Sequence, residues 1–113
     1  AAARSTLRGI AASRGSIQGR VMHASAATGD EASGERCVLV LDDANPHHAG
    51  LLVHASGLVC ERGGVLSHLA IVARELGVPA VMGVPGATSA LPAGSWVEID
   101  GSRGLVRSLT ASA

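Results

Sequence analysis

Apolar residues come in short runs separated by polar or glycine-rich segments, and this pattern predicts a domain in which strands outnumber helices. The run over residues 37–41 is apolar at every position and ends in two aspartates. Such a run is typical of a strand buried on both faces, as in a parallel sheet. Further strands are expected at residues 17–23, 57–60, 80–84, 96–99 and 105–109. The last two are expected to form a C-terminal hairpin through residues 100–104.

One helix is predicted with both of its ends marked. Residues 68–76 are helix formers, and their apolar members recur every three or four positions, so they share one face. Ser67 is suited to the N-cap, Gly77 to the position after the last helical residue, and Pro79 prevents further helix. The helix is therefore expected to begin at a histidine, His68.

The segments between these elements carry fewer signals. Residues 1–13 are small, contain arginines and lack a clear period, so we interpret them as a tail or linker, with the domain itself spanning residues 14–113. A polar loop is expected at residues 28–35. A short helix is expected at residues 47–55, after the break that Asn45-Pro46 introduces.

The composition narrows the class of protein. The chain has 113 residues, of which 47% are hydrophobic and 16% charged, with 15 glycines, and this suits one compact α/β domain. One Trp, no Tyr or Phe and a formal net charge of zero argue against nucleic-acid binding. No apolar run approaches the roughly 20 residues that cross a bilayer, so no membrane partner is expected. Cys37 and Cys60 lie within apolar runs and are interpreted as buried thiols of a cytoplasmic chain.

All nine basic residues are arginines. Without lysine the chain has no P-loop lysine and no lysine for a Schiff base. A biotin- or lipoate-bearing carrier domain is excluded for the same reason, because those groups are attached to lysine.

The segment from Gly63-Gly64 to His68 suits phosphoryl transfer. A neutral imidazole is nucleophilic at neutral pH, because the ordinary pKa of histidine is about 6.5. A helix N-terminus offers unpaired N–H groups and partial positive charge to the anionic product, and glycines let backbone amides approach it. The Ser67 hydroxyl is a further candidate donor. On spacing alone, a histidine at such a junction is more often a capping or partly buried structural residue than a catalytic one.

A longer motif surrounds this histidine. Residues 61–83 read Glu-Arg-Gly-Gly-Val-Leu-Ser-His-Leu-Ala-Ile-Val-Ala-Arg-Glu-Leu-Gly-Val-Pro-Ala-Val-Met-Gly. This sequence resembles the signature of the mobile, swivelling domain of PEP-utilizing enzymes, a family that includes PEP synthase, pyruvate phosphate dikinase, enzyme I of the sugar phosphotransferase system and the rifamycin phosphotransferases. The resemblance extends forward to Asp100-Gly101 and Gly104 and back to residues 9–13 and 15–21, so it covers nearly the whole chain.

The resemblance implies roles for individual residues. His68 corresponds to the family's phosphorylated histidine, and Gly63, Gly64 and Ser67 to the phosphate-binding loop in front of it. Arg74 corresponds to the family's helix arginine and is a candidate phosphate ligand.

An alternative and two departures qualify this correspondence. For Arg74, an ion pair with Glu61 or another nearby acid is the alternative that we favour. Many members of the family carry Thr where this chain has Leu66, and the plant-type dikinases use that Thr for regulatory phosphorylation, which is therefore not expected here. Leu69 stands where Ala is common, and we expect it to mark a different docking surface.

For the whole domain, the resemblance implies a three-layer swivelling β/β/α fold with a mixed sheet, in agreement with the strands, helix and hairpin predicted above. It implies a ping-pong reaction in which the histidine takes a phosphoryl group at one site and passes it on at another. The donor, ATP or PEP, and Mg²⁺ are expected on partner domains, either nucleotide-binding (ATP-grasp-like) or PEP- or acceptor-binding. No metal or cofactor is expected on this domain, which is most often tethered in a larger enzyme and should turn over no substrate alone.

Two other functions stay open. The chain would be an inactive docking or regulatory module if the fold persisted without the chemistry, but degenerate modules tend to lose the histidine that this chain keeps. It would be an anion-binding domain if the helix N-terminus held phosphate without a covalent bond, and binding would then survive His68→Ala.

The remaining polar candidates are interpreted as structural or solvated. The pair His47-His48 has no acidic residue at metal-ligand spacing, and His23 and His54 stand alone. Asp42-Asp43 ends a strand, where carboxylates can bind phosphate-bound Mg²⁺, although we favour a solvated strand end.

Overall fold

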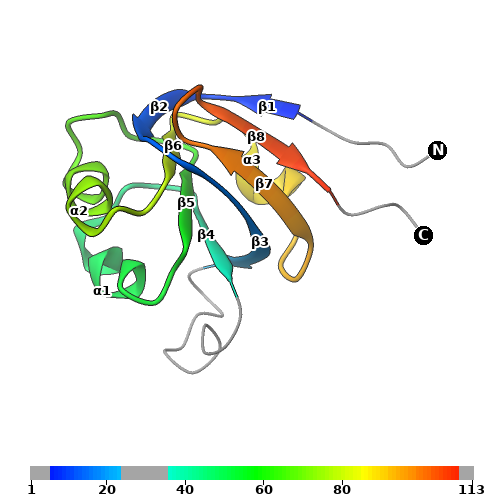
Figure 1. The fold of residues 1–113 in the computed structure, drawn as a ribbon, viewed down its shortest axis with the longest axis horizontal. Helices are drawn as coiled ribbons and strands as arrows, with labels where there is room; N and C mark the ends of the chain where they lie inside the picture. Colours follow the sequence, from blue (N-terminus) through cyan, green and yellow to red (C-terminus); the bar gives the residue numbers. More distant parts are fainter. Residues whose placement is uncertain (1–5, 24–35, 110–113) are drawn as a thin grey trace.

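The computed structural model describes residues 6–23 and 36–109. The strands are β1 (Thr6–Arg8), β2 (Ile10–Ser13), β3 (Ser16–His23), β4 (Cys37–Leu41), β5 (Gly57–Cys60), β6 (Ala80–Met82), β7 (Trp96–Asp100) and β8 (Leu105–Ser108). The helices are the 3₁₀ helix η2 (Pro46–His48) and the α-helices α1 (Ala49–Leu52), α2 (His68–Leu76) and α3 (Ala87–Ala90). Helices α1 and α2 lie together beside the sheet, and α3 lies apart from them (Figure 1). Within the described residues, no helix has the length and apolar character needed to span a bilayer.

The described strands form one mixed sheet in the order β1-β8-β7-β3-β4-β5-β6-β2. Strands β3, β4, β5 and β6 run parallel to one another. Strand β7 pairs antiparallel with β3, and β8 pairs antiparallel with β7 through a turn over residues 101–104. The α/β class and the mixed sheet expected from the sequence are confirmed.

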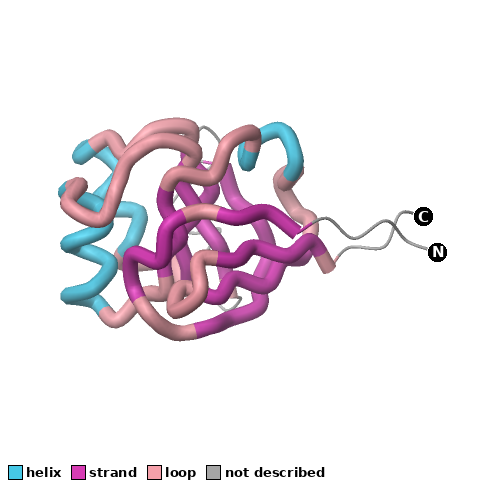
Figure 2. The backbone as a smooth tube through the Cα atoms, turned by 90° about the horizontal axis from the view of Figure 1, so that it is seen from above, coloured by secondary structure: helices cyan, strands magenta, loops and turns pink. Residues whose placement is uncertain are grey.

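The sheet curls until its two ends meet (Figure 2). Strands β1 and β2 stand at opposite ends of the strand order, yet only Gly9 separates them along the chain. The Gly9 N–H donates to the Gly104 carbonyl oxygen at 2.8 Å. A Cβ at position 9 would lie 2.4 Å from the Met82 carbonyl oxygen and 2.6 Å from Val84 Cγ2. Only glycine therefore fits where the two ends of the sheet approach each other.

The curl shows that the interpretation of residues 1–13 as a tail or linker is wrong for residues 6–13. Thr6 of β1 pairs with Arg107 of β8, and Ile10 of β2 pairs with Met82 of β6. Both strands are short, and each finds its partner about 70 to 100 residues away along the chain, so no local period reveals them. Residues 1–5 lie outside the described part of the chain.

Successive residues of the parallel strands are buried on opposite faces of the sheet. Leu39 and Leu41 of β4 belong to the core beneath α1 and α2, whereas Val38 and Val40 belong to the core on the other face. Strands β5 and β6 alternate in the same way. The second core is closed by β7, β8 and α3, which contribute Val97, Ile99, Val106, Ala87 and Leu91. The continuous apolar runs of the sequence thus reflect burial on both faces, as predicted.

Three further differences from the predicted elements have local causes. The short helix expected at residues 47–55 is a 3₁₀ turn followed by α1, which ends at Leu52. Strand β6 ends at Met82, because Gly83 turns the chain with a φ of 64°. The sequence does not predict α3, whose four residues are too few to show a helical period. The polar loop expected at residues 28–35 lies outside the described residues.

Candidate functional site

The loops that follow parallel strands β4, β5 and β6 meet at Gly63. A Cβ on Gly63 would lie 2.8 Å from the Ala44 Cβ, in the loop after β4. The Gly63 carbonyl oxygen lies 3.6 Å from the position of a Cβ on Gly83, in the loop after β6. The carboxyl ends of parallel strands are where open α/β sheets bind their ligands. The segment in front of His68 is therefore placed at the edge of the sheet where function is expected.

His68 is the first residue of α2, and its side chain is exposed. The N-cap is Ser67, as predicted, and the helix ends at Gly77 in a left-handed conformation, also as predicted. The N–H groups of His68 and Leu69 have no intrahelical partner, because the first turn of any helix leaves its amides unpaired. An exposed imidazole thus stands beside unpaired amides and the positive end of the helix dipole.

Ser67 closes a tight turn in front of the histidine. Both its backbone N–H, at 3.0 Å, and its hydroxyl, at 2.7 Å, donate to the Gly64 carbonyl oxygen. The hydroxyl oxygen in turn accepts from the Ala70 N–H at 3.4 Å. The hydroxyl proton is therefore directed at the backbone, and the role of Ser67 as a phosphate ligand stays a prediction.

The two glycines of the loop differ in their surroundings. Gly63 has a φ of 113°, and a Cβ there would meet Ala44, so the backbone requires glycine. Gly64 is not among the residues with positive φ, and a Cβ there would meet no atom within 4 Å. The fold explains Gly63, whereas Gly64 leaves backbone open to approach from outside.

Arg74 contacts backbone carbonyl groups from two elements. Its Nη1 donates to the Ala12 carbonyl oxygen of β2 at 2.8 Å, and its Nη2 donates to the Val65 carbonyl oxygen at 2.7 Å. The guanidinium group therefore ties the loop in front of His68 to strand β2. Its role as a phosphate ligand stays a prediction.

The ion pair favoured between Arg74 and Glu61 is not found among the described residues, because the Glu61 carboxylate has other partners. It accepts from both the hydroxyl and the backbone N–H of Thr88, the latter at 2.7 Å. The hydroxyl of Thr88 and then its N–H lower the pKa of the Glu61 carboxyl. Glu61 thus holds the first turn of α3 against the end of β5, a role that the sequence does not signal.

Both cysteines are free and buried, as predicted. Burial, together with the nearby carboxylates of Asp43 and Asp42, raises the pKa of the Cys60 thiol to about 12. This thiol is protonated at neutral pH and is not a nucleophile.

The other polar candidates do not assemble into a site. The His23 ring nitrogen Nε2 lies 2.8 Å from the Leu91 carbonyl oxygen, and His47 and His54 are exposed. His48 is partly buried, and its Nδ1 has no hydrogen-bond partner. Among the described residues, no three His, Cys, Asp or Glu side chains are grouped to hold a metal ion.

The expectation that Leu69 marks a docking surface is wrong. Leu69 lies on the inner face of α2, and its side chain is completely buried in the core between this helix and the sheet. The neighbouring Leu66 is the exposed one, at 85% of its maximal accessible area. The sequence could not show which of the two side chains is exposed, since both are leucines within two residues of His68.

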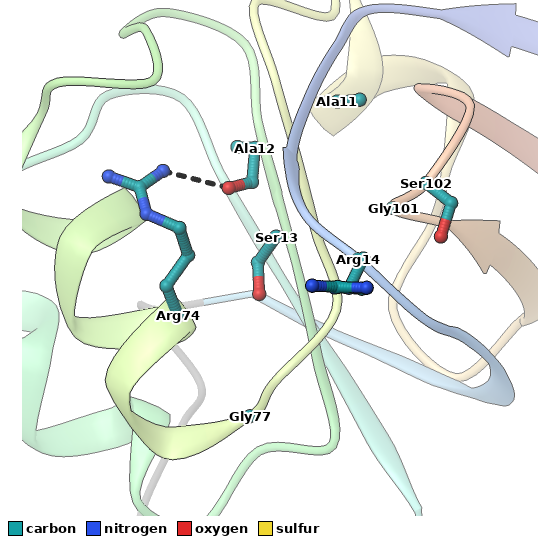
Figure 3. A pocket seen from close by; sticks show the side chains of 8 residues that line it. All are labelled: Ala11, Ala12, Ser13, Arg14, Arg74, Gly77, Gly101 and Ser102. Carbon is teal, nitrogen blue, oxygen red and sulfur yellow. Dashed lines mark hydrogen bonds between the residues drawn. The ribbon is translucent and has the colours of Figure 1, made fainter.

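A hollow of about 670 Å³ lies away from the histidine, between β2, the C-terminal end of α2 and the turn after β7 (Figure 3). Its lining residues are Ala11, Ala12, Ser13, Arg14, Arg74, Gly77, Gly101 and Ser102. Because α2 presents its C-terminal Gly77 there, the hollow lacks the positive helix end that His68 occupies.

Known proteins are similar to this chain over a region that contains residues 61–83. Residues 33–104 match the family described as PEP-utilising enzyme, mobile domain. A probable phosphoenolpyruvate synthase from Pyrococcus horikoshii is 43% identical over 100 residues, which are 88% of this chain and 12% of that protein. The phosphoenolpyruvate synthase of Aeropyrum pernix is 44% identical over 103 residues, with the same coverage of each chain. This chain thus spans about 12% of the length of these relatives.

Solved structures support the same relationship. A solution structure of Enzyme I is 36% identical, with a TM-score of 0.57 over 65% of this chain and 30% of that one. Aconitase X of Thermococcus kodakaraensis has a TM-score of 0.65 over 94% of this chain and 99% of that one, but only 13% identity. The latter likeness is one of fold alone.

Proposed function

Because the chain belongs to the family of PEP-utilising enzyme mobile domains, we propose that it is a phosphoryl carrier that is transiently phosphorylated on His68. The observation that carries this proposal is the exposed imidazole at the first position of α2, behind the turn that Ser67 closes. The histidine can be reached from solvent, and it stands where an anionic product is stabilised.

The reaction consists of two displacements at phosphorus. In the loading step a ring nitrogen of neutral His68 attacks the phosphorus of a bound donor, in line with the oxygen that leaves. The N–P bond forms as the P–O bond breaks, and the leaving oxygen keeps the electron pair. In the unloading step an acceptor oxygen attacks the same phosphorus, and the imidazole leaves with the electron pair of the N–P bond, which restores the carrier.

This chain would stabilise the phosphoryl group mainly through backbone groups. The N–H of exposed His68 is left without an intrahelical partner at the helix N-terminus, where it can donate to one of the phosphoryl oxygens, and the helix dipole adds partial positive charge. Gly64, which carries no side chain into the open space around it, lets those oxygens come close to the loop. Arg74 supports the loop through its two backbone hydrogen bonds.

Donor and acceptor sites belong to other domains or subunits in this account. The relatives are about eight times longer than the matched segment, which leaves room for an ATP- or PEP-binding domain with its Mg²⁺ and for an acceptor site. We propose that the domain swivels between them in the cytoplasm. In this proposal, helices α1 and α2 form one layer of the swivelling fold, and the two halves of the curled sheet form the other two.

The test uses the complete polypeptide that carries these residues, with PEP or with ATP radiolabelled at each phosphate in turn. We expect protein-bound label that is lost in acid and kept in base, as the N–P bond requires. His68→Gln should carry no label, whereas the control His54→Gln, which changes another exposed histidine, should be labelled as the wild type is. Label that persists in His68→Gln, or that never appears in the wild type, would overturn the proposal.

A further inference from the structure

Exposed aliphatic side chains gather around His68. Val65, Leu66 and Ile71 are exposed at 36%, 85% and 41% of their maximal areas, and all three lie within three residues of the histidine. We refer to these three side chains as the apolar rim. Most other large aliphatic side chains of the described part are buried or half-buried.

The structure holds Leu66 outward. Val65 and Leu66 are the central residues of the turn that the Ser67 N–H closes on the Gly64 carbonyl oxygen. The Val65 carbonyl oxygen is held by Arg74 at 2.7 Å. These hydrogen bonds fix the backbone of the turn, from which the Leu66 side chain projects with 85% of its maximal area exposed.

The position of the apolar rim beside His68 implies contact with whatever delivers the phosphoryl group. For in-line transfer, a phosphorus atom must come to about 3–3.5 Å from the imidazole of His68. A body that brings it there also contacts Leu66, which projects from the turn two residues away. Exposed apolar side chains in a cluster are characteristic of binding surfaces.

We propose that the apolar rim is the docking surface for the domain that supplies the phosphoryl group, and that Leu66 is its main contact. This inference rests on the proposed function. The unloaded carrier lacks the phosphoryl charge that the loaded carrier presents, so apolar contact at the rim contributes more to docking on the donor domain than to docking on the acceptor. The loaded carrier presents a dianion, which an acceptor site can bind by charge. The partner surface is therefore an apolar frame around a bound phosphate ester.

The test compares single-turnover labelling of His68 in the complete polypeptide and in three variants. Leu66→Ser should slow labelling about tenfold or more, because a leucine side chain is no longer buried in the docked state. The final labelled fraction should not change, since the contact is absent from both separated states. Leu66→Met should be labelled within about twofold of the wild-type rate, because it keeps the apolar surface.

Val53→Ser is the matched control. Val53 is 67% exposed but lies near the opposite edge of the sheet, where the nearby Ser56 N–H donates to the carbonyl oxygen of Cys37 at the start of β4. It should be labelled at the wild-type rate. Labelling of Leu66→Ser at the wild-type rate, equal slowing in Val53→Ser, or slowing of unloading alone would refute the docking role. Each of these outcomes still requires label on His68, so the carrier function survives them.

Discussion

Gly63 and Gly64 are neighbours in the sequence, yet the fold requires only the first of them. Gly63→Ala would force a left-handed residue with a φ of 113° and press its Cβ against Ala44. We expect it to lower the free energy of unfolding by about 2 kcal/mol or more. Gly64→Ala should change that free energy by less than about 1 kcal/mol, because its Cβ has open space.

Urea denaturation of both variants, followed by the labelling assay, separates these roles. If Gly64 keeps the backbone open to phosphoryl oxygens, Gly64→Ala is labelled more slowly although it is as stable as the wild type. Equal destabilisation by the two substitutions would be incompatible with the different surroundings of the two glycines.

Glu61 makes stability depend on pH. Its pKa is lowered from the ordinary value of 4.5 by the hydroxyl and N–H of Thr88. A carboxyl whose folded-state pKa lies below its unfolded value contributes stability above the unfolded pKa and loses it as pH falls through the folded pKa. We therefore expect wild-type stability to fall more steeply than that of Glu61→Gln as the solution is acidified below about pH 4.5. Parallel curves for the two proteins in urea titrations at successive pH values would contradict this role of Glu61.

The roles of single residues could be predicted only where the signal is local. Ser67 as N-cap and His68 as first helical residue follow from neighbouring residue types. Arg74 and Glu61 could not be paired correctly, because the partners of Arg74 are carbonyl groups of Ala12 and Val65, which any residue would supply.

At the scale of elements, Arg74 joins α2 to the loop in front of it and to β2. We expect Arg74→Gln to lower the free energy of unfolding by about 1 kcal/mol, because one hydrogen bond is solvent-exposed and the other only partly buried. Amide hydrogen exchange should become faster over residues 64–67, and labelling of His68 should slow as the loop loosens.

Glu75→Gln is the control for this prediction, since it changes the neighbouring exposed position on the same helix. If Arg74 acted only as a phosphate ligand, labelling would fall in Arg74→Gln while amide exchange of the loop stayed as in the wild type.

A helix or strand could be predicted from the sequence where neighbouring residues determine it, and not where a distant partner does. Both ends of α2 and the buried strand β4 match the sequence-based expectation residue for residue, because caps and continuous apolar runs are local features. Strands β1 and β2 depend on distant partners in β8 and β6. Helix α3 depends on Thr88 meeting Glu61, 27 residues earlier in the chain.

At the scale of the molecule, the curled sheet with its two cores is the support, and the loops at one of its edges carry the candidate site. Its two ends close at Gly9, and its two faces bury separate cores. The loops at the carboxyl edge of the parallel strands are left to present His68 and the apolar rim. Such a body can present one face to another domain without rearranging its cores, which is what a swivelling carrier requires.

The central claim is that a phosphoryl group becomes bonded to His68, and phosphorus–nitrogen correlation NMR tests it directly. The complete polypeptide, with ¹⁵N in its histidine rings, is loaded from the donor that gives label. The account predicts one phosphorus signal coupled to a ring nitrogen that is assigned to His68 by its absence in His68→Gln. A phosphorus signal coupled to another histidine, or to no nitrogen, would contradict it.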